Sequence, residues 1–170
     1  MGLRASSLGE LIFENCFVPE ERLLGAEGQG LEVALSQLDA GRISIGVVGV
    51  GITEEILRRG WPSLHEEGDK QSVSGYFARW QAIKSLVEKA SALKDKGQKI
   101  STFASQIKLL GTDLAMEVTS YMSLLLGAEG VKVENEFERY FRDAKALQIV
   151  EGTNQVQQRV LAKALDELYV

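Results

Sequence analysis

"GLEVALSQLDAGRISIGVVGVGITEEILRRG", residues 30–60, is the stretch that decides the fold predicted for this chain. Its apolar side chains recur at intervals of three and four residues, which places them along one face of an α-helix. They are Leu31, Ala34, Leu35, Leu38, Ile45, Val48, Ile52 and Ile56. The spacing predicts one long helix that buries this face against other helices.

Glycines interrupt this predicted helix at Gly41, Gly46, Gly49 and Gly51. Each costs up to about 1 kcal/mol relative to alanine inside a helix, so a compensating interaction is expected. Close packing of two helices is the simpler explanation, and close approach of a ligand is the alternative.

Further segments with helical periodicity follow this one. We expect long helices over residues 76–94, 101–126 and 152–168, and a short charged helix over residues 136–143. The polar stretch "HEEGDKQS", residues 65–72, is expected to be a loop. Four long helices joined by modest connections predict an all-α fold, an antiparallel up-and-down four-helix bundle.

The N-terminal segment follows a different pattern. "LGELIFENCFVPEERLLG", residues 8–25, alternates over part of its length and contains Pro19, which favours one or two short strands and a turn. An isolated hairpin is marginal in water, so such strands need a sheet outside this sequence. We therefore expect residues 1–24 to be the remnant of a β-domain and residues 25–170 to form the helical bundle domain.

Composition excludes several classes of function. A net charge of −5 and a pI near 5.1 argue against a nucleic-acid partner, which needs a basic surface. Cys16 and His65 are each alone in the sequence, which argues against a disulfide framework and a metal site. We expect no membrane span, because no segment approaches about 20 apolar residues, and no signal peptide. The chain is expected to be a soluble protein of a reducing compartment.

Glu151 lies in "QIVEGTNQVQ", residues 148–157, where an apolar run meets a helix N-terminus. A carboxylate there can simply interact with the helix dipole, or its burial can make it a general base. From the residues alone the helix-dipole explanation is favoured, because glutamate is common before a helix. Thr153, Asn154 and Gln155 add side-chain donors to the free N–H groups of the helix, a combination that suits phosphate.

Arg42 is flanked by apolar residues and is expected to be partly buried, so its charge needs a partner. Asp39, three residues earlier, is close enough along a helix to form an ion pair. The alternative is a site for an anion such as a phosphate.

Two segments together resemble the C-terminal part of acyl-CoA dehydrogenases, and the resemblance covers nearly the whole chain. Residues 2–43 are similar to the end of the family's middle β-domain and its first C-terminal helix. "LLGAEG" at residues 125–130 and "ENEFERYFRDAKALQIVEGTNQVQ" at residues 134–157 resemble the segment that carries the family's catalytic glutamate. The resemblance implies the family's C-terminal helical bundle for residues 25–170.

The resemblance implies a catalytic role for Glu151: removal of the α-proton of an acyl-CoA thioester while a hydride passes from the β-carbon to FAD. Some members carry the base on the first long helix, at a position that corresponds to Gly41 here, and glycine cannot serve. The implied substrate contacts are Asp39, Arg42, Gly152 and Lys163.

The resemblance also implies FAD as cofactor. The implied FAD contacts are Lys70, Gln81, Gly127, Ala128, Thr153, Asn154 and Gln155. The chain departs from the family pattern at Lys70, where an arginine is common, at Val73, where a phenylalanine is common, and at Leu124, where a glutamine is usual. Lysine keeps the positive charge but lacks the planar fork that binds phosphate through two hydrogen bonds.

We therefore expect the C-terminal domain of an FAD-dependent acyl-CoA dehydrogenase. The isolated chain is expected to be inactive, because the family builds its site from two further domains. Its implied partners are an acyl-CoA substrate, an electron-transferring flavoprotein and further copies of itself, in a dimer or tetramer. The expected location is the bacterial cytoplasm in preference to the mitochondrial matrix. The alternative is a non-catalytic helical oligomerisation module that descends from this family and no longer binds FAD.

Overall fold

The computed structural model describes residues 1–169 of the chain, and in that range its regular structure is entirely helical. The helices are α1 (Gly30–Ser36), α2 (Leu38–Gly60), α3 (Glu67–Asp95), α4 (Ser101–Leu126), α5 (Phe137–Leu147) and α6 (Asn154–Tyr169). Short 3-10 turns cover Glu20–Arg22, Trp61–Ser63, Gly127–Val131 and Val133–Asn135. The predicted all-α fold is confirmed.

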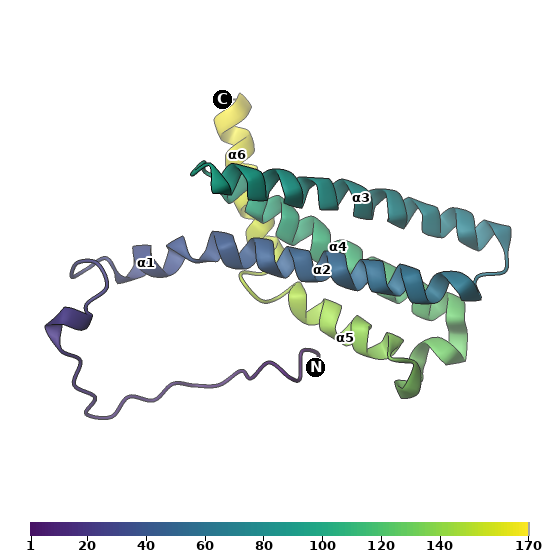
Figure 1. The fold of residues 1–170 in the computed structure, drawn as a ribbon, viewed down its shortest axis with the longest axis horizontal. Coiled ribbons are helices and arrows are strands. Elements are labelled where there is room, and N and C mark those ends of the chain that lie inside the picture. The colour runs from purple at the N-terminus through teal and green to yellow at the C-terminus, as the bar shows by residue number, and fades with distance from the viewer. Residues whose placement is uncertain (170) are drawn as a thin grey trace.

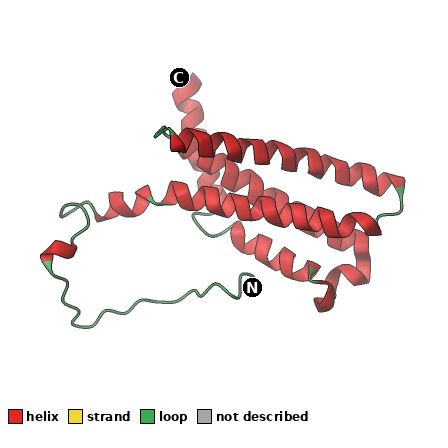
Figure 2. Cartoon of the chain, viewed as in Figure 1, coloured by secondary structure: helices red, strands yellow, loops and turns green. Residues whose placement is uncertain are grey.

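Helices α2, α3 and α4 run alternately in opposite directions and form the body of the bundle (Figure 1). Helix α5 runs back beside them, and α6 crosses them steeply and projects past the end of α3. The turn between α5 and α6 lies beneath the start of α2 (Figure 1). Figure 2 shows the same arrangement, with a long loop as the N-terminal segment.

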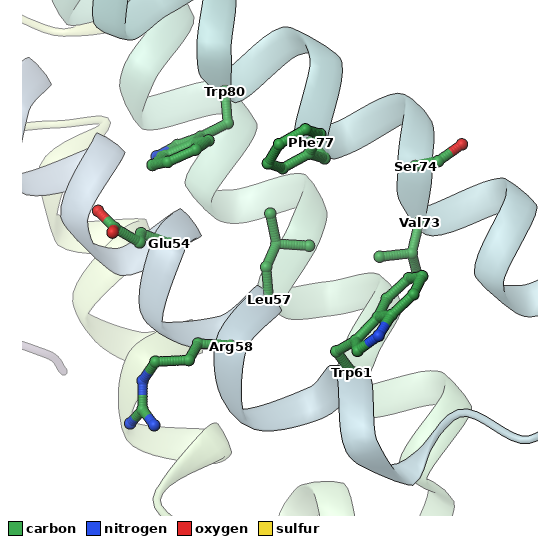
Figure 3. Close-up of a pocket in the computed structure, with 8 residues that line it drawn as sticks. All are labelled: Glu54, Leu57, Arg58, Trp61, Val73, Ser74, Phe77 and Trp80. Atoms are coloured by element: carbon green, nitrogen blue, oxygen red, sulfur yellow. The ribbon is translucent and has the colours of Figure 1, made fainter.

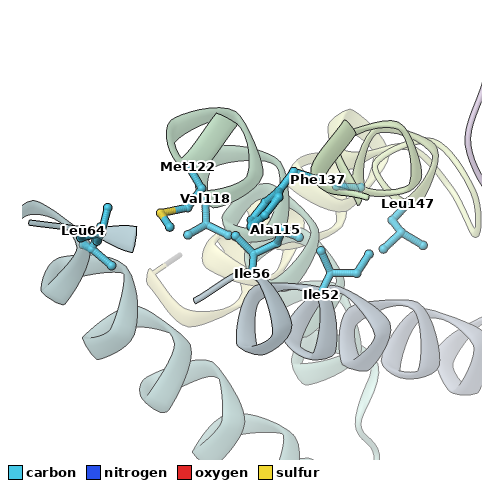
Figure 4. Close-up of a cluster of buried hydrophobic side chains, with 10 residues drawn as sticks. Ile52, Ile56, Leu64, Ala115, Val118, Met122, Phe137 and Leu147 are labelled. Atoms are coloured by element: carbon cyan, nitrogen blue, oxygen red, sulfur yellow. The ribbon is translucent and has the colours of Figure 1, made fainter. Parts of the chain in front are cut away.

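Helix α4 is the centre of the core and has the largest number of buried residues of the six helices. Apolar side chains from four helices meet on it in one cluster (Figure 4). The buried members are Ile52, Ile56, Leu64, Val73, Ala115, Val118, Met122, Phe137, Ala144 and Leu147. A smaller cluster contains Trp80, whose indole Nε1 donates a hydrogen bond to the carbonyl oxygen of Val50 at 3.1 Å.

Glycines allow α2 and α4 to pack backbone against backbone. A Cβ atom at Gly49 would lie 2.5 Å from the carbonyl oxygen of Gly111, and one at Gly111 would lie 2.6 Å from that of Gly46. Contacts this short with backbone atoms leave room only for hydrogen. Close helix packing is therefore confirmed at Gly46 and Gly49, whereas Gly51 faces open space.

Two predicted helix boundaries are corrected. Residues 67–75, expected in part as a polar loop, form the first turns of α3. The acidic side chains of Glu67 and Asp69 lie in its first turn, where they interact favourably with the helix dipole. The helix predicted over residues 30–60 is divided at Gln37 into α1 and α2.

The strands predicted within residues 8–25 do not form in the part of the chain that the structure describes. Apart from the 3-10 turn at Glu20–Arg22, this segment is a loop, and its large apolar side chains, including Leu8, Ile12 and Phe17, are exposed. A strand needs a neighbour that completes its hydrogen bonds, and no strand partner is present among residues 1–169. The residues before this segment dock on α5: the N–H of Leu3 donates a hydrogen bond to Asp143 Oδ1. The domain division at residue 24 stays a prediction.

Residues 30–63 form a helical stretch that is long and apolar enough to cross a membrane, by length and composition alone. The expectation that no segment is apolar enough is therefore corrected, whereas the expected absence of a membrane span stays a prediction. The stretch contains many valine, isoleucine and leucine residues, which raise its mean hydropathy. Because Gly46 and Gly49 pack directly on α4, we assign α2 to the protein core.

Candidate functional site

Glu151 lies in the turn between α5 and α6 with its backbone in the left-handed region. Its φ angle is 54°, and that of the following Gly152 is 83°. Glycine adopts this conformation readily, whereas a residue with a side chain is strained in it. Strain of this kind persists only where surrounding contacts hold the backbone, so the turn at Glu151 requires such contacts.

The carboxylate of Glu151 lies against Gly41 of α2. A Cβ atom at Gly41 would be 2.4 Å from Oε2 and 2.7 Å from Cδ of Glu151. The half-buried carboxylate therefore uses space that only a glycine at position 41 leaves open. The structure brings together the base predicted from the sequence and the position that carries the base in other members of the resembled family.

Lys108 of α4 holds both ends of this turn, and the sequence interpretation missed it. Its Nζ donates to the carbonyl oxygen of Gln148 at 3.0 Å and to Oδ1 of Asn154 at 2.5 Å. The side chain is fully buried. One signal was present in the sequence: Lys108 is a charged residue within the stripe Ala104–Ala115, whose neighbours at helical spacing are small or apolar.

Burial lowers the pKa of Lys108 from 10.5 to about 8, because the interior solvates its charge poorly. The nearby carboxylate of Asp113 opposes this change, and the positive charge of Arg42 adds to it. The pKa of the Lys108 amine is therefore shifted towards neutrality.

Asn154 faces the interior. Its Nδ2 donates to Thr112 Oγ1 at 2.9 Å and to Asp113 Oδ1 at 2.6 Å, and its side chain is nearly inaccessible. Its backbone N–H donates to the carbonyl oxygen of Gln148 at 3.0 Å. These contacts assign the side chain to the support of the turn, so they do not favour the FAD contact that the resemblance implies.

Gln157 is a second supporting residue that the sequence interpretation missed. From the second turn of α6 its Nε2 donates to the carbonyl oxygens of Gly152 at 3.0 Å and of Glu151 at 3.3 Å. The residue is fully buried. Lys108 thus holds the ends of the turn, and Gln157 holds its middle.

Asp39 and Arg42 lie on α2 on either side of Gly41. Arg42 Nη1 contacts Asp39 Oδ1 at 3.1 Å, and Ser101 Oγ donates to Asp39 Oδ2 at 2.5 Å. The structural ion pair predicted from the sequence is therefore present. Arg42 Nε is buried without a hydrogen-bond partner among the described residues, so the guanidinium is not saturated by this pair. A contact of either residue with substrate stays a prediction.

Lys70 and Gln81 lie on one face of α3. They are eleven residues apart, close to three helical turns, and the intervening Ser74 and Phe77 share that face. Ser74 and Phe77 are among the residues that line an apolar cavity of about 530 Å³ between α2 and α3, where the Phe77 ring lies opposite Leu57 (Figure 3). Its full lining is Glu54, Leu57, Arg58, Trp61, Val73, Ser74, Phe77 and Trp80.

The remaining predicted site residues fall into three places. Gly127 and Ala128 are exposed in the turn that follows α4, at the end of the bundle where α3 begins (Figure 1). Thr153 and the exposed Gln155 start α6, at the opposite end, near Glu151. Lys163 is exposed further along α6. The structure therefore gathers Asp39, Arg42, Glu151 and Gly152, and it separates them from Lys70, Gly127 and Ala128.

Donors on α3 and at the start of α6 have the chemistry to contact a dinucleotide such as FAD. Its pyrophosphate is anionic and its rings carry many acceptors, which match the amine of Lys70, the amides of Gln81 and Gln155, and the N-terminus of α6. Because Lys70 and the N-terminus of α6 lie at different ends of the bundle, one chain alone does not surround a single ligand with all of these donors.

Comparison with known proteins identifies the relatives of this chain. Residues 28–165 match the family described as acyl-CoA dehydrogenase, C-terminal domain. The chain is 34% identical over 176 residues to the short-chain specific acyl-CoA dehydrogenase of Megasphaera elsdenii, which covers 97% of this chain and 46% of that protein. It is 33% identical to the acryloyl-CoA reductase (NADH) of Anaerotignum propionicum, over 96% of this chain and 44% of that protein.

Comparison with solved structures gives the same family. The butyryl-CoA dehydrogenase of Megasphaera elsdenii superposes with a TM-score of 0.78 at 35% identity, over 87% of this chain and 42% of that one. A chain in the structure of the electron transferring flavoprotein of Acidaminococcus fermentans superposes with a TM-score of 0.85 at 36% identity, over 91% and 43%. This chain therefore spans less than half the length of these relatives, and it belongs to the acyl-CoA dehydrogenase family, whose C-terminal domain it matches.

Proposed function

We propose that this chain is the C-terminal domain of a flavoprotein that dehydrogenates an acyl-CoA thioester, with Glu151 as the base. The observation that carries the proposal is the turn at Glu151. A strained backbone held by Lys108 and Gln157 directs a half-buried carboxylate into the notch at Gly41. A residue that served only to interact with a helix dipole would need neither the strain nor the notch.

In the proposed reaction Glu151 accepts the proton on the α-carbon of the acyl group. The electron pair of that C–H bond forms the α,β double bond as a hydride leaves the β-carbon, and bound FAD supplies the acceptor for this hydride. In the reverse direction Glu151 would return the proton, which is consistent with a reductase among the relatives. The ion pair of Arg42 and Asp39 borders the same notch, and we assign it to the substrate side.

The proposal includes a larger assembly. The relatives are more than twice as long as this chain, so the other walls of the site would come from further domains. Thr153 and Gln155 would contact the cofactor beside Glu151, whereas Lys70, Gln81, Gly127 and Ala128 would contact the FAD of a neighbouring subunit. An electron-transferring flavoprotein is the proposed electron acceptor. The isolated chain is expected to have no appreciable activity.

Glu151→Gln tests the proposal in the complete flavoprotein that carries this domain. The amide keeps the shape of the side chain and removes its basicity, so bleaching of the flavin by acyl-CoA is expected to slow by about 10³-fold or more. Acyl-CoA affinity, measured by titration of the flavin absorbance, is expected to stay within about threefold. Bleaching at the unsubstituted rate would remove Glu151 from the mechanism.

One observation favours a second candidate, a helical oligomerisation module without FAD. Val73 replaces a phenylalanine common in the family, and its smaller side chain is buried in the core. Flavin absorbance separates the two candidates. A complete protein that is purified without flavin and takes up none on addition of FAD would support the module.

A further inference from the structure

We propose that Lys108 and Asp113 form a clamp that positions Glu151, because together they bridge the two ends of its turn twice. The identity of Glu151 as a base rests on the proposed function. The clamp itself is a statement about this chain's own residues, so it can be tested without substrate or flavin.

The first bridge is the amine of Lys108. It reaches the backbone carbonyl of Gln148, at the start of the turn, and the side chain of Asn154, at its end, with distances of 3.0 and 2.5 Å. Residues 149–153, which include Glu151, lie between these two points. Lys108 belongs to α4, the helix with the most buried residues. Its hydrogen bonds therefore attach the turn to the core of the domain.

The second bridge is the carboxylate of Asp113. Its Oδ1 accepts a hydrogen bond from Gln148 Nε2 at 2.6 Å and another from Asn154 Nδ2 at 2.6 Å. The same two residues are therefore joined by a cation and by an anion of one helix, five residues apart. Hydrogen bonds to charged groups are stronger than neutral ones, so both bridges are of the strong kind.

The clamp does not depend on one protonation state of the amine. The charged groups that influence Lys108 are Asp113 on its own helix and Arg42 on α2. A protonated amine has three hydrogens for its two acceptors, and a neutral amine still has two. Lys108 can therefore donate to Gln148 and Asn154 at pH values below and above its lowered pKa. This property indicates a constant structural support and not a pH-dependent switch.

Loss of the clamp should release the strain at the turn. Glu151 is held at a φ angle of 54°, which a free chain would leave for the ordinary right-handed or extended regions. The carboxylate would then move out of the notch at Gly41, although the helices on either side would remain. Lys108 is thus a positioning residue, because it acts on the reaction only through Glu151.

Amide hydrogen exchange of the 170-residue chain tests the clamp. The informative protons are the N–H groups of Val150 and Asn154, which donate to Ala146 and Gln148. In Lys108→Met their exchange is expected to accelerate roughly ten- to a hundredfold relative to amides in the middle of α2, because bonds to a charged group are lost. The matched control is Thr119→Val, an equally buried polar position on α4 that bonds only within its helix.

In the control Thr119→Val, any change in amide exchange is expected to be similar in all helices, with no additional acceleration at Val150 and Asn154. Equal acceleration of all helices in Lys108→Met, or unchanged exchange at Val150 and Asn154, would overturn the clamp. If Lys108→Met does not fold, Asn154→Ala removes one of the two partners shared by both bridges and is expected to give the same local pattern. Even acceleration in that variant overturns the clamp in the same way.

A kinetic measurement in the complete flavoprotein separates positioning from general structural support. Lys108→Met is expected to slow flavin bleaching about tenfold or more while acyl-CoA affinity changes less than about threefold. Equal losses in both quantities would contradict positioning. Since the exchange measurement involves no chemistry, a failure of Glu151→Gln would refute the proposed base and leave the clamp standing.

Discussion

At the scale of single residues, the contact between Glu151 and Gly41 is the most informative in the molecule. The two positions are 110 residues apart in the sequence and meet through the packing of the α5–α6 turn against α2. Gly41 is explained neither by helix packing nor by a turn, since the Cβ atom it lacks would collide with a carboxylate. The position of the Glu151 carboxylate therefore explains the glycine at position 41, and that glycine gives the carboxylate its space.

Gly41→Ala is expected to displace the carboxylate without unfolding the domain. The new methyl group would meet the mobile end of a glutamate side chain, which can move, and alanine favours the helix by up to about 1 kcal/mol. The melting temperature is expected to hold or rise, whereas flavin bleaching in the complete flavoprotein falls about tenfold or more. Full activity together with a stable fold would show that the notch does not position Glu151.

Lys108 is expected to make stability depend on pH. Its pKa is about 8 in the folded chain and 10.5 when exposed, so between these values the unfolded state binds more protons. Below pH 8 both states hold the proton and burial of the charge destabilises the folded state; this cost disappears as the pH rises towards 10.5. The free energy of unfolding of the unsubstituted chain should therefore rise relative to that of Lys108→Met between pH 7.5 and 10, measured with urea.

The comparison between the two chains removes the effects of other titrating groups, which both share. A difference in the free energy of unfolding that stays constant over this pH range would contradict the assigned burial of the amine.

At the scale of secondary-structure elements, the packing of α2 on α4 determines where the site forms. Gly46, Gly49 and Gly111 bring the two backbones into contact along one line. This close approach places the first turns of α2, which carry Asp39 and Arg42, beside the segment of α4 that carries Lys108. The glycines that weaken α2 as an isolated helix thus stabilise the pair.

A pair of alanine substitutions on α2 measures this contribution. Gly49→Ala is expected to destabilise the domain by about 2 kcal/mol or more, because its Cβ meets the backbone of α4 at 2.5 Å and cannot be relieved by a side-chain movement. The matched control Gly51→Ala faces open space and is expected to stabilise the domain by up to about 1 kcal/mol. Urea unfolding of the two variants gives both values, and equal effects would contradict the assigned packing.

At the scale of the whole molecule, large apolar side chains remain exposed on several surfaces. Trp61 and Phe77 border the cavity between α2 and α3 and are 46% and 50% exposed, and Leu124 is 75% exposed. Residues 8–24 expose several more. Apolar surface on this scale typically contacts another domain or another subunit.

The chain is therefore expected to self-associate. Light scattering should report a mass above the 18.6 kDa of one chain at micromolar concentration. Phe77→Ser, which removes an exposed aromatic side chain from the border of the cavity, is expected to shift the population towards the monomer. A chain that is strictly monomeric before any substitution would contradict the prediction.

The sequence by itself determined the helices, because the period of apolar residues reports which face of a helix is buried whatever that face contacts. The helix over residues 101–126 was predicted to the residue. The resemblance to the family also singled out Glu151 and the absence of a rival base at Gly41. The strand prediction failed, because strands depend on partners that local alternation does not report.

Only the tertiary structure decided which residues meet. Periodicity identifies buried positions but not their partners, so it could not show that Lys108, Asp113 and Asn154 join at the turn of Glu151. Asn154 illustrates the limit: its place before a helix suggested a ligand contact, and the fold directs its side chain to α4. The physical reason is that contacts between residues far apart in sequence arise from the packing of whole helices. The geometry of Glu151 depends on three helices, α2, α4 and α6.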